Sequence, residues 1–235
     1  MDNGTSQSGL TLIETMIVVG VVIVLVAIVV AMAGHIDEQS KIRLMRGNFG
    51  TINAALQRFN QHGYHYEDLD KPGQKDPLLE FLQFPLDCCG LGDDELMKTF
   101  EYAFGIQEVS IINGVHDSNY SGSEGLYFFL SQVPGCKSIL SRLESSAITA
   151  ESTDGVLEIE VLELQEKYKM SLNRIVDPWG KSLRYDYYDY DKQTQTVPFS
   201  QTALEDIQDT LKVFPVISSA GPDGKFGTND DITNK

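Results

Sequence analysis

The tail of the chain gathers the side chains that a hard metal ion selects. Three aspartates and three glycines lie between Ser218 and Ile232: Asp223, Asp230, Asp231, Gly221, Gly224 and Gly227. Carboxylate oxygens on a loop that glycine lets turn tightly favour an oxygen-preferring cation such as Ca²⁺. Asp and Gly are also ordinary turn residues, so an acidic turn without metal is the alternative.

Two other kinds of site are excluded for this tail. Counted from Asp223, the third and fifth positions are Lys225 and Gly227 and the twelfth is Asn234, which does not fit an EF-hand. The sequence contains no GxSxG, P-loop or HExxH motif. Adjacent carboxylates on one loop are also poorly placed to act as acid and base on opposite sides of a substrate. We therefore expect that the protein is not an enzyme.

The cysteines give a weaker signal. Cys88, Cys89 and Cys136 are an odd number of thiols, so one bridge from Cys136 to either member of the adjacent pair would leave one thiol free. No CxxC motif or partnering histidine indicates a metal site. A structural disulfide and inert thiols are the two interpretations that remain.

The elements that must position these groups begin with a long apolar run. Residues 15–34 are twenty consecutive residues without a charge. As a helix they would span ~30 Å, the thickness of the hydrocarbon core of a bilayer. A fully buried core helix is the alternative, although such a helix rarely stays apolar on every side. Glu14 stands at the edge of this run, where a carboxylate costs a few kcal/mol unless it is paired.

The pattern then becomes amphipathic without a loop signal. Apolar residues recur at steps of three and four: Ile42, Met45, Phe49, Ile52, Leu56 and Phe59. This stripe predicts that the helix continues and packs on a globular domain. The predicted helix runs from about Leu10 to Gln61, is ~80 Å long and ends at His62 and Gly63, where glycine suits a left-handed cap.

Shorter elements follow, separated by Gly and Pro. The predicted helices span residues 76–84, 123–133 and 137–146, and the predicted strands span residues 101–113, 156–164, 183–190 and 211–218. The fold class is therefore α+β, with a long N-terminal α-helix packed on a small antiparallel β-sheet. Residues 63–175 are predicted to be an insertion rich in helices and loops, and residues 176–235 a β-sheet region that contains the loop 218–232.

The overall charge excludes one class of partner. The chain has 34 acidic and 18 basic side chains, which gives a formal net charge of −16. A surface that binds phosphates needs a basic excess, so nucleic acid is not an expected partner.

The N-terminus resembles a known signal. Gly9 followed by Leu10, Glu14 and the apolar run resembles the class III signal of type IV pilins and type II secretion pseudopilins. The resemblance implies that a prepilin peptidase cuts between Gly9 and Leu10, removes residues 1–9 and methylates the new N-terminus on Leu10. Glu14 would then be the fifth residue of the mature chain, and its carboxylate would pair with the amino group of Leu10 in a neighbouring subunit, which sets the assembly register.

The tail and the upstream segment Asp177-Pro178-Trp179-Gly180 resemble the major pseudopilin of type II secretion systems. The resemblance implies a calcium site whose ligands are the carboxylates of Asp223, Asp230 and Asp231, the residue Ser219 and the carbonyl groups of Ala220 and Lys225. Asn229 would take the place of a ligand if the register differs by one. Calcium would stabilise the loop against the repulsion between its carboxylates.

The function implied by this resemblance is structural. The chain would be a subunit of a type II secretion pseudopilus, a helical homo-oligomer that drives protein export. It would be held in the inner membrane by a single span, with its C-terminal domain in the periplasm. Minor pseudopilins and an inner-membrane assembly platform would be its partners. The alternative is a type IV pilin or minor pilin that acts in surface adhesion, but the absence of cysteines after Cys136 favours the pseudopilin.

Overall fold

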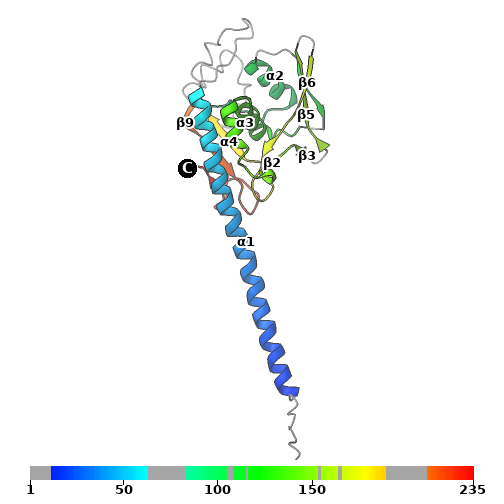
Figure 1. The fold of residues 1–235 in the computed structure, drawn as a ribbon, viewed down its shortest axis with the longest axis vertical. Coiled ribbons are helices and arrows are strands. Elements are labelled where there is room, and N and C mark those ends of the chain that lie inside the picture. Colours follow the sequence, from blue (N-terminus) through cyan, green and yellow to red (C-terminus); the bar gives the residue numbers. More distant parts are fainter. Residues whose placement is uncertain are drawn as a thin grey trace, which may run out of the picture. The chain divides into compact units, whose positions relative to one another are not determined.

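The computed structural model describes residues 12–62, 83–104, 108–114, 116–152, 155–163, 166–188 and 211–235. The chain divides into two compact units, Met1–Lys41 and Ile42–Lys235. Helix α1 (Leu12–His62) contributes to both and is a single helix of 51 residues, drawn from blue to cyan in Figure 1. The predicted helix is confirmed over these residues.

In the first unit, α1 presents apolar side chains on every side. The segment Leu12–Val30 is long and apolar enough to cross a membrane, and none of it is buried inside the protein. Leu12 is 79% exposed and Ile13 69% exposed. A core helix is covered by its own domain, and this segment is not covered within its unit.

In the second unit, the predicted stripe of α1 faces the core. The buried side chains on this stretch are Met45, Phe49, Ile52, Ala55, Leu56 and Phe59. Helix α4 (Pro134–Leu140) lies against it, since the Cys136 thiol donates a hydrogen bond of 3.2 Å to the carbonyl of Ala55. Helix α3 (Ser121–Gln132) confirms the helix predicted over 123–133 and adds Leu126, Phe129 and Leu130 to the same core.

The strands form antiparallel sheets. One sheet has the order β1-β5-β6 and another the order β10-β9-β8, and two strand pairs, β2-β7 and β3-β4, complete the described strands. Their bounds are β1 Val109–Asn113, β2 Ile148–Thr149, β3 Glu151–Ser152, β4 Gly155–Val156, β5 Glu158–Glu163, β6 Glu166–Ser171, β7 Arg174–Ile175, β8 Arg184–Tyr188, β9 Leu211–Ser219 and β10 Ile232–Thr233. The α+β class is confirmed, although the small sheet of the prediction is divided into several.

One predicted element was wrong in its first part. The strand expected from residue 101 begins only at Val109, and Glu101 to Phe104 instead end helix α2 (Asp93–Phe104). Three acidic residues in the first turn of α2 favour a helix through its dipole. Phe100 of α2 stacks on Phe128 of α3, with ring centroids 3.9 Å apart. This contact stabilises the C-terminal half of α2 against α3.

Other boundaries moved by a few residues. The helix predicted over 137–146 begins at Pro134 and ends at Leu140, and a short 3₁₀ helix follows at Ser145–Ala147. Strand β6 was not predicted at all, because three of its six residues are charged. The helix predicted over 76–84 lies outside the described residues except for its last two, which are not helical.

Candidate functional site

The C-terminal loop is the connection between two paired strands. Strands β9 and β10 are antiparallel, with Ser219 opposite Ile232 and Ser218 opposite Thr233. Residues 220–231 therefore leave and re-enter the sheet at neighbouring positions. This pairing brings Asp223, Asp230 and Asp231 into one loop, as their spacing predicted.

The base of the loop is joined to the segment that starts at Asp177. The Ser219 hydroxyl donates a hydrogen bond of 2.7 Å to Oδ2 of Asp177 and accepts one of 3.1 Å from the Gly221 amide. The other oxygen of Asp177 accepts from the amides of Trp179 and Lys181, at 3.0 and 2.8 Å. Because Asp177 is 2% exposed, one buried carboxylate organises both segments.

Each aspartate of the loop binds a backbone amide of the loop. Asp223 Oδ1 accepts from the Lys225 amide at 2.8 Å, and Asp230 Oδ2 accepts from the Asp223 amide at 3.0 Å. Asp231 Oδ2 accepts from the Gly227 amide at 2.7 Å. The Thr228 hydroxyl donates to Asp230 Oδ1. The Thr228 hydroxyl and the Asp223 amide lower the pKa of Asp230, so its charged form is favoured.

Glycine is required at the start of this loop. Gly221 has φ +63°, and a Cβ added there would lie 2.3 Å from the carbonyl oxygen of Asp230. Gly224 and Gly227 also have positive φ, at +67° and +87°. The tight path of the loop therefore comes from its glycines and brings the two ends of the loop into contact.

The loop offers the oxygen atoms that a hard cation prefers, but their arrangement does not form a metal site. Oδ1 of Asp231 is buried and accepts no hydrogen bond from the described residues, which leaves it available to bind a cation. However, no three Asp, Glu, His or Cys side chains of the described residues are grouped closely enough to hold a metal. The Ser219 hydroxyl and the Lys225 carbonyl already have hydrogen-bond partners. Metal binding would therefore require the carboxylates to move closer together than they are now.

The other predicted site residues are distributed differently. Gly9 and Leu10 lie outside the described residues. Glu14 lies in the first turn of α1. None of the three cysteines forms a disulfide with another. Burial raises the pKa of the Cys136 thiol to about 11, which makes it unreactive.

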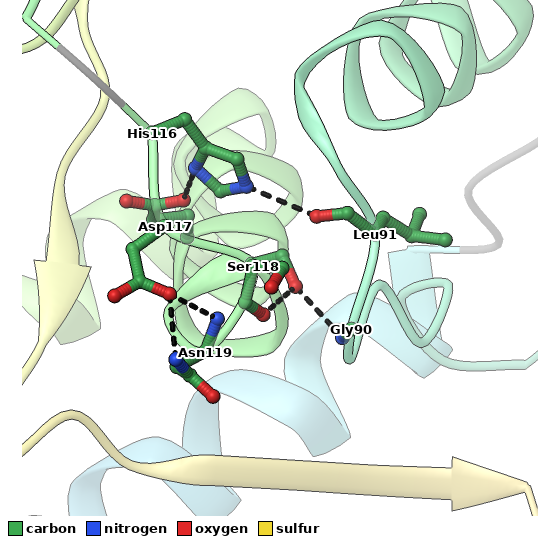
Figure 2. Close-up of polar contacts among 8 residues, drawn as sticks. Gly90, Leu91, His116, Asp117, Ser118 and Asn119 are labelled. Atoms are coloured by element: carbon green, nitrogen blue, oxygen red, sulfur yellow. Dashed lines mark hydrogen bonds and ion pairs between the residues drawn. The ribbon is translucent and has the colours of Figure 1, made fainter.

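A second polar cluster, which was not predicted from the sequence, lies in the core. Nδ1 of His116 is 2.8 Å from Oε2 of Glu124 in α3, and both side chains are 0% exposed. Nε2 of the same ring lies 3.0 Å from the carbonyl oxygen of Leu91, as Figure 2 shows. The only signal was a glutamate directly before the apolar stretch GLYFFL, since the spacing of His116 and Glu124 matches no motif.

The two groups of this pair influence each other's protonation. Burial by itself lowers the pKa of His116, but the hydrogen bond and charge of Glu124 outweigh it, so that the pKa is raised. Burial raises the pKa of Glu124 against the opposing effect of His116. The pair as a unit therefore keeps a proton to higher pH than a histidine in water does.

Comparison with known proteins adds no relative: no protein-family model, no curated protein and no solved structure matches this chain.

Proposed function

We propose that this protein is a pilin-like subunit of a type II secretion pseudopilus, held in the inner membrane by α1. The observation that carries the proposal is the composition of α1 along its length. The helix is uncovered and apolar over Leu12–Val30 and is buried in its own domain from Met45 onward, without a break between them. A cleavable secretory signal normally precedes the folded domain and is separate from it, which α1 is not.

The uncovered segment needs an apolar environment. Covering a Val, Leu or Ile side chain contributes ~1.5–3 kcal/mol, and most residues of Leu12–Val30 are of these types. The segment is therefore stable in a bilayer or against other apolar helices and unstable in water. A pilin-like subunit meets both environments, first in the membrane and then in the filament core.

Glu14 fits an assembly role in this setting. It is the acidic residue of the first turn of α1 and adjoins the apolar segment, where a carboxylate is costly without a cation. In the proposed filament, the cation is the methylated amino group of Leu10 in a neighbouring copy. The pairing sets the axial position of each new subunit in the homo-oligomer.

Calcium is proposed as the ion of the C-terminal loop. Asp223, Asp230 and Asp231 would hold it, with Ser219 and the carbonyl groups of Ala220 and Lys225 nearby, and the unsatisfied Oδ1 of Asp231 supports this. The ion would supply positive charge between adjacent carboxylates. In the proposed arrangement the domain 42–235 lies in the periplasm, where the assembly platform and minor pseudopilins are its partners.

The processing step tests the proposal. The full chain would be co-expressed with a prepilin peptidase, and the mass and N-terminal sequence of the product determined. We expect a chain that begins with methylated Leu10, and no cleavage in a Gly9→Val variant. A Glu14→Ala variant should be cleaved but not assembled into filaments, whereas the matched control Glu38→Ala should assemble. An uncleaved wild-type chain would leave a membrane-anchored protein of another class.

A further inference from the structure

The buried histidine of the core has no neutral state that satisfies both of its nitrogens while Glu124 is ionised. Nε2 of His116 faces the carbonyl oxygen of Leu91 at 3.0 Å, and Nδ1 faces a carboxylate oxygen of Glu124 at 2.8 Å. A carbonyl oxygen can only accept, so Nε2 must carry a hydrogen. A neutral ring would then turn the lone pair of Nδ1 toward an ionised carboxylate. One additional proton is therefore needed for this arrangement.

Bulk solvent does not reach the pair. Both side chains are 0% exposed, and Oε1 of Glu124 is buried without a hydrogen bond from the described residues. We propose that His116 and Glu124 form a buried proton-binding site, an imidazolium paired with a carboxylate, that fastens residues 88–91 to α3 and releases them when the proton is lost. The proposal is independent of the pilin-like function.

Two charged neighbours and one helix dipole favour an imidazolium paired with a carboxylate. Asp93 of α2 acts on the ring and stabilises its cation. Arg174 of β7 stabilises the carboxylate of Glu124, as does the position of Glu124 in the first turn of α3, where the helix dipole is positive. These groups favour the charged pair, whereas burial and Asp117, which both raise the pKa of Glu124, oppose its carboxylate form.

The segment that the pair holds also packs against the first turns of α3. The Gly90 amide donates to the Ser121 hydroxyl at 2.9 Å, and that hydroxyl donates to the Ser118 carbonyl at 2.7 Å (Figure 2). Cys88 is fully buried, and a Cβ added at Gly125 would lie 2.6 Å from its sulfur. Of these contacts, only the one through His116 depends on a proton. Cys88 faces the pair as well, since the charge of Glu124 adds to the burial that raises the pKa of its thiol.

Loss of the proton has a defined consequence. Two atoms with lone pairs would face each other at 2.8 Å, so His116 must withdraw from Glu124 or from Leu91. Withdrawal from Leu91 frees residues 88–91 and exposes Cys88. Since the pKa of His116 is raised in the folded state, the stabilisation is complete below the ordinary histidine pKa. It is lost as pH rises through the folded value.

Histidine NMR tests the protonation state directly. The full chain in detergent micelles would be labelled with ¹⁵N-histidine, and the signals of His116 identified by their loss in a His116→Gln variant. At about pH 7.5, one unit above the ordinary histidine pKa, we expect both nitrogens of His116 to carry hydrogens. A neutral ring at this pH would overturn the proposal, whatever the variants do.

A matched pair of variants tests whether the His116–Glu124 pair holds residues 88–91. In Glu124→Gln the side-chain amide can donate to Nδ1 while Nε2–H donates to Leu91, so no additional proton is needed. In wild type, the ratio of folded to unfolded protein should fall with rising pH by up to about tenfold per unit. It should be nearly constant across the same range in Glu124→Gln. Glu144→Gln, which removes the same charge from an exposed site, should behave as wild type.

Thiol labelling reports the opening itself. Cys89 is exposed and serves as an internal reference for the ordinary increase of thiol reactivity with pH. The labelling rate of Cys88 relative to Cys89 should rise with pH in wild type and stay low in Glu124→Gln. A constant ratio in wild type, or the same rise in both proteins, would show that the pair does not control the segment.

Discussion

The hydroxyl group of Ser219 donates a hydrogen bond of 2.7 Å to the carboxylate of Asp177, and both residues are buried. The two lie 42 residues apart in the chain. The contact connects the turn at 177–181 to the strand from which the acidic loop leaves. The loop and this turn are thus one structural unit.

Ser219→Ala should destabilise the domain. It leaves an oxygen of Asp177 and the amide of Gly221 without the partner that they have now. Burial of such unsatisfied groups costs about 1–3 kcal/mol, which thermal or denaturant unfolding of the full chain would measure. Ser218→Ala, at the neighbouring half-buried position, is the control and should change the stability little. Equal effects of both changes would contradict the role of the Asp177 contact.

Gly221→Ala should destabilise more than Gly227→Ala. Both glycines have positive φ, which costs an alanine about 1–2 kcal/mol. At Gly221 the new Cβ also meets the backbone oxygen of Asp230 at 2.3 Å, whereas at Gly227 nothing lies within 4 Å. The difference between the two variants, measured in denaturant, isolates the contact between the ends of the loop. If Gly221→Ala destabilises the protein less than Gly227→Ala, the two ends of the loop can separate without a cost in stability.

Calcium should raise the unfolding midpoint of the full chain. At a free concentration ~100-fold above the dissociation constant, mass action adds ~2.7 kcal/mol to the free energy of unfolding. Scans in EDTA and in excess calcium would measure the shift. The double variant Asp223→Ala, Asp230→Ala should lose it, and the exposed control Glu144→Ala should keep it. If calcium leaves the wild-type midpoint unchanged, the loop is an acidic turn and the adhesive pilin becomes the better hypothesis.

Asn234→Ala should loosen the contact between the C-terminus and α1. The side chain of Asn234 donates to Asn53 Oδ1 at 2.7 Å and to the Pro215 carbonyl at 3.2 Å, and accepts from the Ile217 amide at 3.0 Å. We expect a loss of about 1–3 kcal/mol and faster hydrogen exchange at Ile217. The exposed control Asn229→Ala should leave that exchange unchanged. Unchanged exchange in Asn234→Ala would show that the strand holds this amide in place without it.

Elements with a strong local pattern were predicted well. The stripe of α1 from Met45 to Phe59 was read correctly because one face of a helix recurs every three to four residues, whatever its neighbours are. Helix α2 was missed and its last residues were predicted as strand, because Phe100 packs on Phe128, a residue of another helix. The pairing of β6 with β5 brings Lys169 opposite Glu160, and an isolated charged segment does not reveal such a partner.

The sequence by itself determined the uncharged run of residues 15–34, the amphipathic continuation of that helix and the acidic, glycine-rich loop. These properties depend only on residues that are close together in the chain, so they can be recognised without knowing the rest of the fold. Only the tertiary structure decided that Asp177 meets Ser219 and that His116 lies between Glu124 and Leu91. Such contacts arise from the packing of whole elements, which the spacing of single residues does not encode. The protonation of His116 follows from that packing, because only complete burial makes an unsatisfied nitrogen costly.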